Sequence, residues 1–508
     1  MKKKILVIGG GIAGLSAGGY LAMNDFEVEI YERNRMAGGV CNAWQRGDYT
    51  IDLCLHLLAG AGPASVHYEK WNELLPMDEI GYCPMEEYMR VENVARDAVR
   101  VFADPNRLEK ELLEKAPEDA GAIREFTAAL RKFAQYEDAH DKAPELTTFW
   151  ERVRKYGDIM PYEALIERFS KISLEDYAAE FSNPLLQKVI MNLSEPRASA
   201  ICALMGLAWM GVGKAGYPRG GSMPFVQRIL DRYLGLGGKI FYETNVVRIL
   251  VEEDRAVGIV LDDGRQIRAD YIVSAADGHA TLYELLEGKY VGKVFEKFYR
   301  GHETFPSLVF IALGLRKDLS GLPAHLLFPI RGTLIIDPDT IIDELSVRVH
   351  HFDPLLAPKG KTLVSVHIPT ANYGYWRKLQ QSNPEKYRSE KNRIAQAVIQ
   401  ALEERFGDFA EYVEMIDVAT PGTIIDFTNN WKGSFEGWIQ DPKTGLKNLP
   451  HTLPGLRDLY MCGQWIAIGG GLPGVLLSAR DVAQLICDQE GMEFRHYPAV
   501  ESQESQMQ

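Results

Sequence analysis

Several features that would mark common classes of protein are scarce or absent in this 508-residue sequence. It contains six cysteines, with no C-x-x-C pair and no close cluster of cysteine and histidine, so we expect neither a disulfide framework nor a zinc site. It also has no Ser-His-Asp set, no other cluster of metal ligands and no Walker-type loop. We therefore predict buried, reduced thiols and no bound metal, which suits a reducing cytoplasm.

Basic residues are outnumbered by acidic ones. The 56 lysines and arginines against 70 aspartates and glutamates give a net charge of −14. Such a balance disfavours nucleic acid as a partner and provides no general attraction to anionic lipid.

Long hydrophobic runs are missing as well. The longest apolar stretch, residues 198–212, contains two glycines and is shorter than the roughly 20 residues that a spanning helix needs. We interpret it as a buried helix and keep peripheral membrane contact as the alternative. The basic N-terminus lacks the apolar core of a signal peptide, so a cytoplasmic protein is expected, with membrane association left open.

What is present is an ordinary globular composition, with 46% hydrophobic and 25% charged residues. A chain of this length exceeds one compact core, so we expect two domains or more.

The first forty residues hold the pattern around which the rest of the chain is organised. A buried strand (residues 5–8), a glycine-rich turn, a helix (residues 15–24) and a second strand (residues 28–31) that ends in an acid follow in this order. The turn and the acid comprise Gly9, Gly11, Ile12, Ala13, Gly14 and Glu32. The glycines allow the backbone and the helix N-terminus to approach a pyrophosphate, while Glu32 can bind ribose hydroxyls and would repel the 2′-phosphate of NADP. The order predicts a dinucleotide-binding site.

A second glycine pair follows the acid and indicates which dinucleotide is bound. Arg33 begins a segment that leads to Gly38, Gly39 and Val40, and residues 49–52 then form a short predicted strand. An NAD-type fold does not need this pair, whereas a flavin reaches farther and would lie against the exposed backbone. These residues favour FAD.

With these motifs the chain resembles the phytoene desaturase, carotenoid isomerase and retinol saturase-like group of FAD-dependent oxidoreductases. The resemblance returns in order at residues 217–222, 246–249, 273–277 and 459–479. It implies an α/β fold: a discontinuous, Rossmann-like FAD-binding domain of glutathione reductase type, with an α+β substrate domain made of an antiparallel sheet and a helical insertion.

The domain boundaries follow from composition and from the resemblance. We predict an FAD-binding domain from residues 1–75, 215–290 and 450–490, a substrate domain from residues 76–214 and 291–449, and a polar, frayed tail at residues 491–508. Within the substrate domain, strands are expected at residues 307–315, 326–336, 345–352 and 362–368.

The resemblance also implies cofactor contacts later in the chain. The backbone at Val246 would lie against the adenine, with Ala275 nearby, and Gly463 would lie beside the pyrophosphate and ribityl. N–H groups at the start of the last helix would face the pyrimidine end of a non-covalently bound flavin and stabilise its reduced, negative form. That helix start comprises Gly471, Leu472, Pro473, Gly474 and Val475.

Few side chains are candidates for proton transfer. If the strand ending at Asp52 continues, Asp52, Cys54 and His56 alternate onto one face. His56 is the candidate acid or base near neutral pH, although its position favours a structural, hydrogen-bonded histidine. Asp52 is interpreted as a turn or anchor. Related saturase-like members carry a glycine where this chain has Cys54, and the larger residue reduces the clearance expected beside the flavin.

An aromatic, glycine-rich segment supplies the candidate substrate pocket. Trp431, Phe435 and Trp438 either line an apolar tunnel for a long polyene or acyl chain or pack in the core.

Four functions remain open at this point. The first is an FAD-dependent oxidoreductase that desaturates or saturates C=C and CH–CH bonds of an apolar isoprenoid or lipid by hydride transfer to or from flavin N5. The second is a redox-neutral cis–trans isomerase that needs reduced flavin. The third is a non-catalytic lipid-binding protein of the GDP-dissociation-inhibitor type, which the intact cofactor motifs disfavour. The fourth, an amine oxidase relative, usually has aromatic residues near the last motif, and the glycine run at residues 469–471 offers none.

Overall fold

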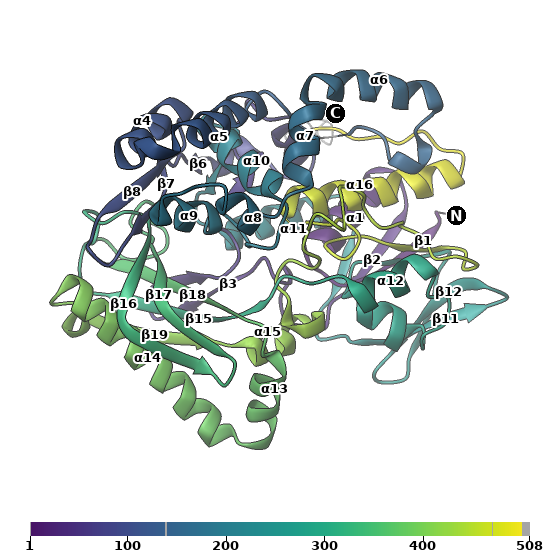
Figure 1. Ribbon diagram of the computed structural model, residues 1–508. Helices are drawn as coiled ribbons and strands as arrows, with labels where there is room; N and C mark the ends of the chain where they lie inside the picture. Colours follow the sequence, from purple (N-terminus) through teal and green to yellow (C-terminus); the bar gives the residue numbers. More distant parts are fainter. Residues whose placement is uncertain (1, 138–139, 470, 500–508) are drawn as a thin grey trace.

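The computed structural model describes residues 2–137, 140–469 and 471–499. Two large sheets lie side by side, with a layer of helices covering one side of both (Figure 1). The predicted α/β architecture is confirmed, with a Rossmann-like parallel sheet beside a substrate-domain sheet.

The first sheet is parallel and joins strands from three separate parts of the chain. Its order is β10-β2-β1-β14-β20, with bounds β1 (Lys4–Ile8), β2 (Glu27–Tyr31), β10 (Lys239–Phe241), β14 (Tyr271–Ser274) and β20 (Leu459–Met461). Its central strands are continuous apolar runs because both faces are covered. Helices α1 (Ile12–Met23), α11 (Ser222–Gly235) and α16 (Leu472–Gln489) pack on one face. The hairpin strands β11 (Val246–Glu252), β12 (Arg255–Leu261) and β13 (Gln266–Arg268) cover the other.

The second sheet has seven strands in the order β19-β15-β18-β17-β16-β7-β8. Their bounds are β7 (Glu87–Glu92), β8 (Ala98–Phe102), β15 (Ser307–Leu315), β16 (His325–Asp337), β17 (Thr340–Val349), β18 (Thr362–Thr370) and β19 (Val413–Ala419). The prediction covered β15 to β18 and missed β7, β8 and β19. The predicted antiparallel pairing holds for the neighbouring strands except β7 and β16, which pair in parallel. Long-range pairing, which local sequence does not reveal, decides both points.

One face of this second sheet packs on the helices α13 (Tyr373–Ser382) and α14 (Pro384–Phe406) through an apolar core. The other face lies toward the interior of the molecule. Helix α15 (Pro421–Thr428) contacts β15 and β19 of this sheet, whereas α12 (Lys293–Gly301) packs against the hairpin that covers the first sheet.

Two small sheets connect the large ones. They contain the hairpin β3 (Ala43–Arg46) and β4 (Tyr49–Asp52), and the set β5 (Leu58–Ala59), β9 (Ala215–Pro218) and β6 (Tyr82–Cys83). Strand β4 ends at Asp52, because its Oδ1 accepts hydrogen bonds from the N–H groups of Cys54 and Leu55 and turns the chain. The expectation that Asp52, Cys54 and His56 share one strand face is therefore wrong, and Asp52 is an anchor at a turn.

The helical layer occupies the top of the molecule in Figure 1. Its helices are α4 (Pro105–Lys115), α5 (Ala120–Phe133), α6 (Phe149–Ile159), α7 (Glu163–Ser170), α8 (Leu174–Ala178), α9 (Pro184–Met191) and α10 (Ala200–Gly211). The short helices α2 (Val66–Asn72) and α3 (Met77–Ile80) pack instead in the core of the first sheet. The apolar stretch at residues 198–212 forms α10, which packs in the core of this layer. In the described part of the chain, no helix combines the length and apolar character needed to cross a bilayer.

Helix α6 differs from its neighbours because its large apolar side chains face outward. Phe149 and Trp150 are 70% and 76% exposed, and Met160 just beyond the helix is 60% exposed.

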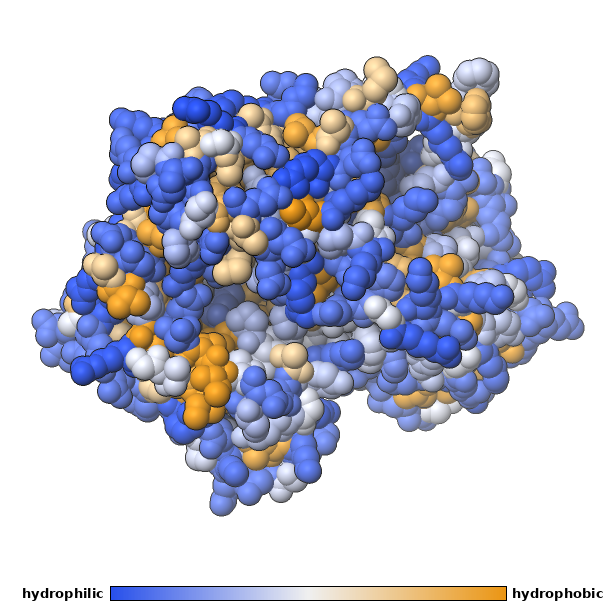
Figure 2. Space-filling model, viewed as in Figure 1, coloured by the Kyte–Doolittle hydropathy of each residue, from blue (hydrophilic) through white to orange (hydrophobic). Residues whose placement is uncertain are grey.

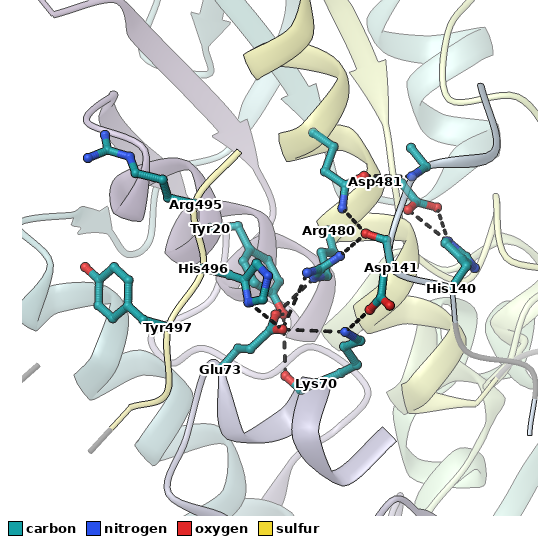
Figure 3. A network of polar contacts seen from close by, with 12 residues as sticks. Tyr20, Lys70, Glu73, His140, Asp141, Arg480, Asp481, Arg495, His496 and Tyr497 are labelled. Atoms are coloured by element: carbon teal, nitrogen blue, oxygen red, sulfur yellow. Dashed lines mark hydrogen bonds and ion pairs between the residues drawn. The ribbon is translucent and has the colours of Figure 1, made fainter. Parts of the chain in front are cut away.

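A buried network of charges fastens α16 to α2 and to the segment before α6 (Figure 3). Arg480 is 1% exposed, and its Nε donates to Glu73 Oε2 at 3.0 Å while its Nη1 donates to the Asp141 carbonyl at 2.6 Å. Glu73 also accepts a hydrogen bond of 2.8 Å from the Tyr20 hydroxyl and lies 3.7 Å from Lys70 Nζ. Every member of this network has a partner of opposite charge or a hydrogen bond.

The segment that follows α16 is tied to the end of α1 at Asn24 and, through the N–H of Ala499, to the carbonyl of Asn72 in α2. Arg495 N donates to Asn24 Oδ1 at 2.7 Å, and Asn24 Nδ2 donates back to the Arg495 carbonyl at 2.9 Å. The frayed tail that we predicted from residue 491 is therefore wrong for these residues. Its last part, residues 500–508, lies outside the described residues.

Candidate functional site

A cavity of roughly 900 Å³ runs between the two sheets and under the helical layer. Its walls come from the turn after β1, the start of β11, the loop that leads into α16, and one side of α10. Segments far apart in the sequence thus meet at one internal space, whose size is typical of ligand sites.

The first glycine turn has the geometry that its sequence predicts. Gly9 has φ = +97°, which favours glycine, and a Cβ at Gly14 would lie 1.9 Å from the Gly9 carbonyl oxygen. At Gly11, in contrast, an added Cβ would meet nothing closer than 3.8 Å. Gly11 is also the N-cap of α1 and provides no side-chain cap, so the first N–H groups of α1 are left for a ligand.

Glu32 ends β2 at the edge of this turn and is 5% exposed. Its Oε2 accepts a hydrogen bond of 2.7 Å from Gly10 N, and its Oε1 accepts one of 2.8 Å from Asn34 N. Each carboxylate oxygen can accept more than one hydrogen bond, so the position suits the ribose contact that the sequence predicted.

The second glycine pair lies beside the first turn. Gly38 has φ = +120°, and a Cβ there would lie 2.6 Å from the Cys41 carbonyl oxygen. Gly38 forms an isolated parallel bridge with Gly11, which brings the two glycine motifs into register. Gly39, at φ = +60°, continues the same bare backbone along the cavity.

The third glycine motif closes the cavity from the other side of the sheet. Gly463 and Gly471 have φ angles of +101° and +80°. Gly471 caps α16 without a side-chain hydrogen bond, so a second helix begins at the cavity with uncapped N–H groups. Gly470, in the middle of the predicted glycine run, lies outside the described residues.

All but one of the predicted cofactor residues border this cavity. They are Gly9, Gly11, Ile12, Ala13, Glu32, Arg33, Gly38, Gly39, Val40, Val246, Ala275, Gly463, Gly471, Leu472, Pro473, Gly474 and Val475. The exception is Gly14, which packs against Gly9 behind the turn. Three glycine turns and two uncapped helix starts on one elongated cavity fit a dinucleotide with a flavin end, and the role of each residue stays a prediction.

His56 lines the cavity, but its environment differs from the one expected. Its Nδ1 lies 3.2 Å from the Cys54 carbonyl oxygen. Burial, and next the positive charge of Arg348, lower the pKa of His56 to about 3. The expectation that His56 titrates near neutral pH is therefore wrong, because a group with this pKa is a neutral imidazole at pH 7.

A carboxyl group that the sequence analysis missed has the pKa expected of an acid or base. Glu436 lines the cavity, and burial raises its pKa to about 7. It stands between Phe435 and Trp438 in the aromatic segment, and that position in a predicted substrate segment is the one sequence signal that favoured it.

Another buried acid, Asp52, is held by hydrogen bonds instead. Asp52 accepts bonds of 2.6 and 2.8 Å from the Ser222 N–H and hydroxyl, and burial raises its pKa to about 6. Its four hydrogen bonds mark it as the anchor between β4 and α11.

Two cysteines that are distant in sequence meet at the cavity wall. Cys41 and Cys54 both border the cavity, and hydrogen bonding to the Cys41 thiol, followed by burial, raises the pKa of Cys54. Both are free thiols, as are the other four cysteines, all of which are at least partly buried. Among the described residues, no group of cysteine, histidine and carboxylate side chains is arranged to hold a metal ion.

The three aromatic residues predicted for the substrate pocket separate in the structure. Phe435 lines the cavity. Trp438 is fully buried, with its ring centroid 5.4 Å from that of Trp465 and 5.8 Å from that of Trp431. Trp438 therefore packs in the core, whereas Trp431 is only partly buried and does not border this cavity.

The apolar wall comes mainly from α10, which the sequence analysis interpreted only as a buried helix. The cavity-facing residues of this helix are Ile201, Cys202, Ala203, Met205, Gly206, Leu207 and Trp209. Leu57 and Ile166 extend the same wall. This end of the cavity can hold an apolar chain.

Comparison with known families gives a match over nearly the whole chain. The family model described as "Flavin containing amine oxidoreductase" matches residues 12–487.

Two curated proteins and one solved structure illustrate the similarity. The chloroplastic prolycopene isomerase of Arabidopsis thaliana is 23% identical over 523 residues, which cover 96% of this chain and 83% of that protein. The 1-hydroxycarotenoid 3,4-desaturase of Flavobacterium sp. (strain P99-3) is 24% identical over 517 residues, with coverages of 95% and 99%. The structure of cyclohexylamine oxidase from Brevibacterium oxydans IH-35A superposes with a TM-score of 0.57 at 16% identity, covering 97% of this chain and 100% of the other, which shows a common fold.

Proposed function

The chain belongs to the flavin-containing amine oxidoreductase family, and from this premise we propose that it is an FAD-dependent enzyme acting on C=C or CH–CH bonds of a polyene or unsaturated lipid. The observation that carries the proposal is the single cavity, which joins three glycine turns and two uncapped helix starts to an apolar wall on α10. Membership in a family of oxidoreductases favours an enzyme over the non-catalytic lipid-binding protein.

The chain's own residues would hold the cofactor along the cavity. The start of α1 would bind the pyrophosphate, Glu32 the adenosine ribose, and Gly38 and Gly39 the ribityl side of the flavin. When bound, FAD would supply the acceptor or donor of the hydride. The start of α16 would place N–H groups and the positive end of a helix dipole beside the flavin ring.

Glu436 is the proposed proton-handling group. With a pKa of about 7 it can hold a proton below neutral pH and accept one above it, and it has no hydrogen-bond partner among the described residues that would fix either form. His56 is proposed to act as a neutral wall of the same pocket. Desaturation would use Glu436 as the base, and saturation would use it as the acid.

The redox-neutral alternative rests on the isomerase relative. Cis–trans isomerisation of a polyene would use the same cavity and the same apolar wall. The reactions differ in net electron transfer, which a spectrum can follow.

The membrane contact predicted from residues 198–212 is reassigned in this proposal to α6, because α10 is buried. Phe149 and Trp150 project from α6 among Arg152 and Arg154, and Figure 2 shows hydrophobic side chains among charged ones over this end of the molecule. Helix α7, which follows α6 along the chain, contributes Ile166 to the cavity wall, so a lipid surface at α6 could deliver an apolar substrate. Sedimentation with phosphatidylglycerol vesicles, lost in Trp150→Ser, would test this.

The function is tested by the visible spectrum of the purified protein under anaerobic conditions, before and after adding phytoene. We expect a yellow protein, and bleaching of the flavin on addition would identify a dehydrogenase. A spectrum that stays oxidised, with altered polyene isomers after the flavin is chemically reduced, would instead identify an isomerase. A colourless protein that cannot be reconstituted with FAD would contradict the proposal.

A matched pair of variants connects the colour to the site. Gly11→Ala adds a methyl group where the protein leaves room, so the chain should fold and bind FAD at least tenfold more weakly. Gly121→Ala, on α5 and away from the cavity, also adds a methyl group without a close neighbour and should keep the colour.

A further inference from the structure

The interior face of the seven-stranded sheet carries a row of polar side chains. His325 of β16 lies opposite Arg348 of β17, and Arg348 lies opposite Ser365 of β18. Residues two positions away along β17 and β18, among them His350 and His367, share this face. A sheet face that is turned into the molecule is normally apolar, so the row requires an explanation.

Arg348 stands at the centre of this row without a counter-ion. No hydrogen bond or ion pair to its guanidinium is found among the residues that the structure describes. Burial lowers the pKa of Arg348, yet its side chain keeps partial accessibility. This cation is therefore neither paired within the described part of the fold nor fully exposed to bulk solvent, and its neighbours His56 and Tyr88, not Arg348 itself, border the cavity.

The histidines around Arg348 supply no compensating charge. Burial, and next the positive charge of Arg348, lower the pKa values of His325, His350 and His367, so all three are neutral at pH 7. His325 Nε2 lies 2.8 Å from the Ser346 hydroxyl, which holds that ring in place. The row therefore has a net charge of one, carried by Arg348.

The charged row adjoins the substrate end of the cavity. His56 and Tyr88 both line the cavity, and the charge of Arg348 acts on both. The ring of Tyr88 lies 6.2 Å from that of His325, centroid to centroid. The charge of Glu436 also acts on Tyr88, but no ion pair between Glu436 and Arg348 is found among the described residues, and the pKa of Glu436 is raised to about 7 by burial.

We propose that Arg348 binds a carboxylate at one end of the substrate, so that the substrate is an unsaturated chain ending in an acid group. This inference rests on the proposed function and narrows the proposed substrate from a fully apolar polyene to one that carries an acid group. A single uncompensated guanidinium matches a monoanion, and its planar fork matches the two oxygens of a carboxylate. A phosphate dianion would leave one negative charge buried, because the neutral histidines cannot balance it.

The test is a binding titration on the FAD-loaded protein, with oleate and oleyl alcohol presented from the same concentration of cyclodextrin. The two probes share a chain and differ in the charged group. We expect oleate to bind roughly ten- to a hundredfold more tightly than the alcohol. Arg348→Gln should bring the two affinities within about threefold, and Arg348→Lys should restore part of the preference. Arg331→Gln, an exposed arginine of β16, is the matched control and should change neither affinity.

Equal affinity for acid and alcohol in the unaltered protein would overturn the proposal, and so would a preference that survives in Arg348→Gln. Tighter binding of dodecyl phosphate than of laurate would overturn the choice of a carboxylate. The flavin spectrum of each variant reports folding and cofactor binding separately. A yellow protein that reacts with the polyene but binds oleate and oleyl alcohol equally would contradict this inference alone. A colourless protein that binds oleate more tightly than oleyl alcohol would contradict only the proposed function.

Discussion

Arg480 and Arg348 are both held inside the protein, and their surroundings are opposite. Arg480 is bound to Glu73 and to the Asp141 carbonyl, with His496 Nδ1 also 3.0 Å from Glu73 (Figure 3). Among the described residues, the titratable groups on which the charge of Arg348 acts are histidines that are neutral at pH 7 and Tyr88. A buried cation that the fold itself neutralises holds elements together, whereas one that the fold leaves unpaired is available to something that enters from outside.

The same contrast separates two glutamates. Glu73 accepts hydrogen bonds from Tyr20 and Arg480, while Glu436 has burial as the only cause of its raised pKa. The paired Arg480 and Glu73 lie where α16 meets α2. The unpaired Glu436 lies on the cavity, and the unpaired Arg348 lies next to residues that border it. The pattern of pairing therefore divides structural charge from functional charge without reference to any ligand.

Removing the paired cation should have the largest effect on stability. Arg480→Met leaves the buried Glu73 with the weaker contacts to Lys70, His496 and the Tyr20 hydroxyl, so we expect the free energy of unfolding to fall by about 4 kcal/mol. Urea denaturation at pH 7 measures it. The double variant Arg480→Met/Glu73→Gln should recover part of the lost free energy of unfolding. An Arg480→Met variant as stable as the parent would show that Arg480 is not structural and would contradict the comparison.

Removing the unpaired acid should change stability in a pH-dependent way. The pKa of Glu436 in the folded state, about 7, is above its unfolded value near 4.5. The neutral form is thus favoured by folding, and that contribution is complete below pH 4.5 and lost as the pH rises to 7. Glu436→Gln should be more stable than the parent by about 3 kcal/mol at pH 8 and by much less at pH 5. Parallel denaturation curves with no pH-dependent difference would show that Glu436 is solvated or paired.

Removing the unpaired cation should have the smallest effect. Arg348→Met deletes a charge that the fold does not neutralise, so the free energy of unfolding should stay within about 1 kcal/mol of the parent or rise slightly. Arg331→Gln, on the outer surface of the same sheet, sets the baseline of roughly ±0.5 kcal/mol. A loss of several kcal/mol in Arg348→Met would mean that this arginine, like Arg480, is structural.

The cofactor half of the site could be predicted because its residues are neighbours in sequence. Gly9, Gly11 and Glu32 all belong to one strand-helix-strand unit, so the local backbone conformation determines where each of them lies. The glycine φ angles follow from the turns themselves.

The substrate half could not be predicted in the same way, because long-range packing decides it. Ser346, Arg348 and His350 alternate with the buried Val347 and Val349, a pattern that normally indicates one face in water. Only the arrangement of the two sheets shows that this polar face is turned inward. The prediction that His56 titrates near neutral pH is wrong for the same reason. The charge that adds to burial in lowering its pKa belongs to Arg348, which is 292 positions away along the chain.

The order in which the five-stranded sheet is assembled has a consequence for biosynthesis. Strand β1 pairs with β14, more than 260 residues later, and β14 pairs with β20, which begins at Leu459. Nascent chains emerge from the ribosome in sequence order, and contacts between distant residues form late. A ribosome-bound chain that ends before Leu459 has the first glycine turn but lacks both the final strand and α16. We therefore expect the chain to bind the flavin only after all strands of this sheet have been synthesised. A shortage of flavin would then slow the maturation of finished chains and would not slow their elongation.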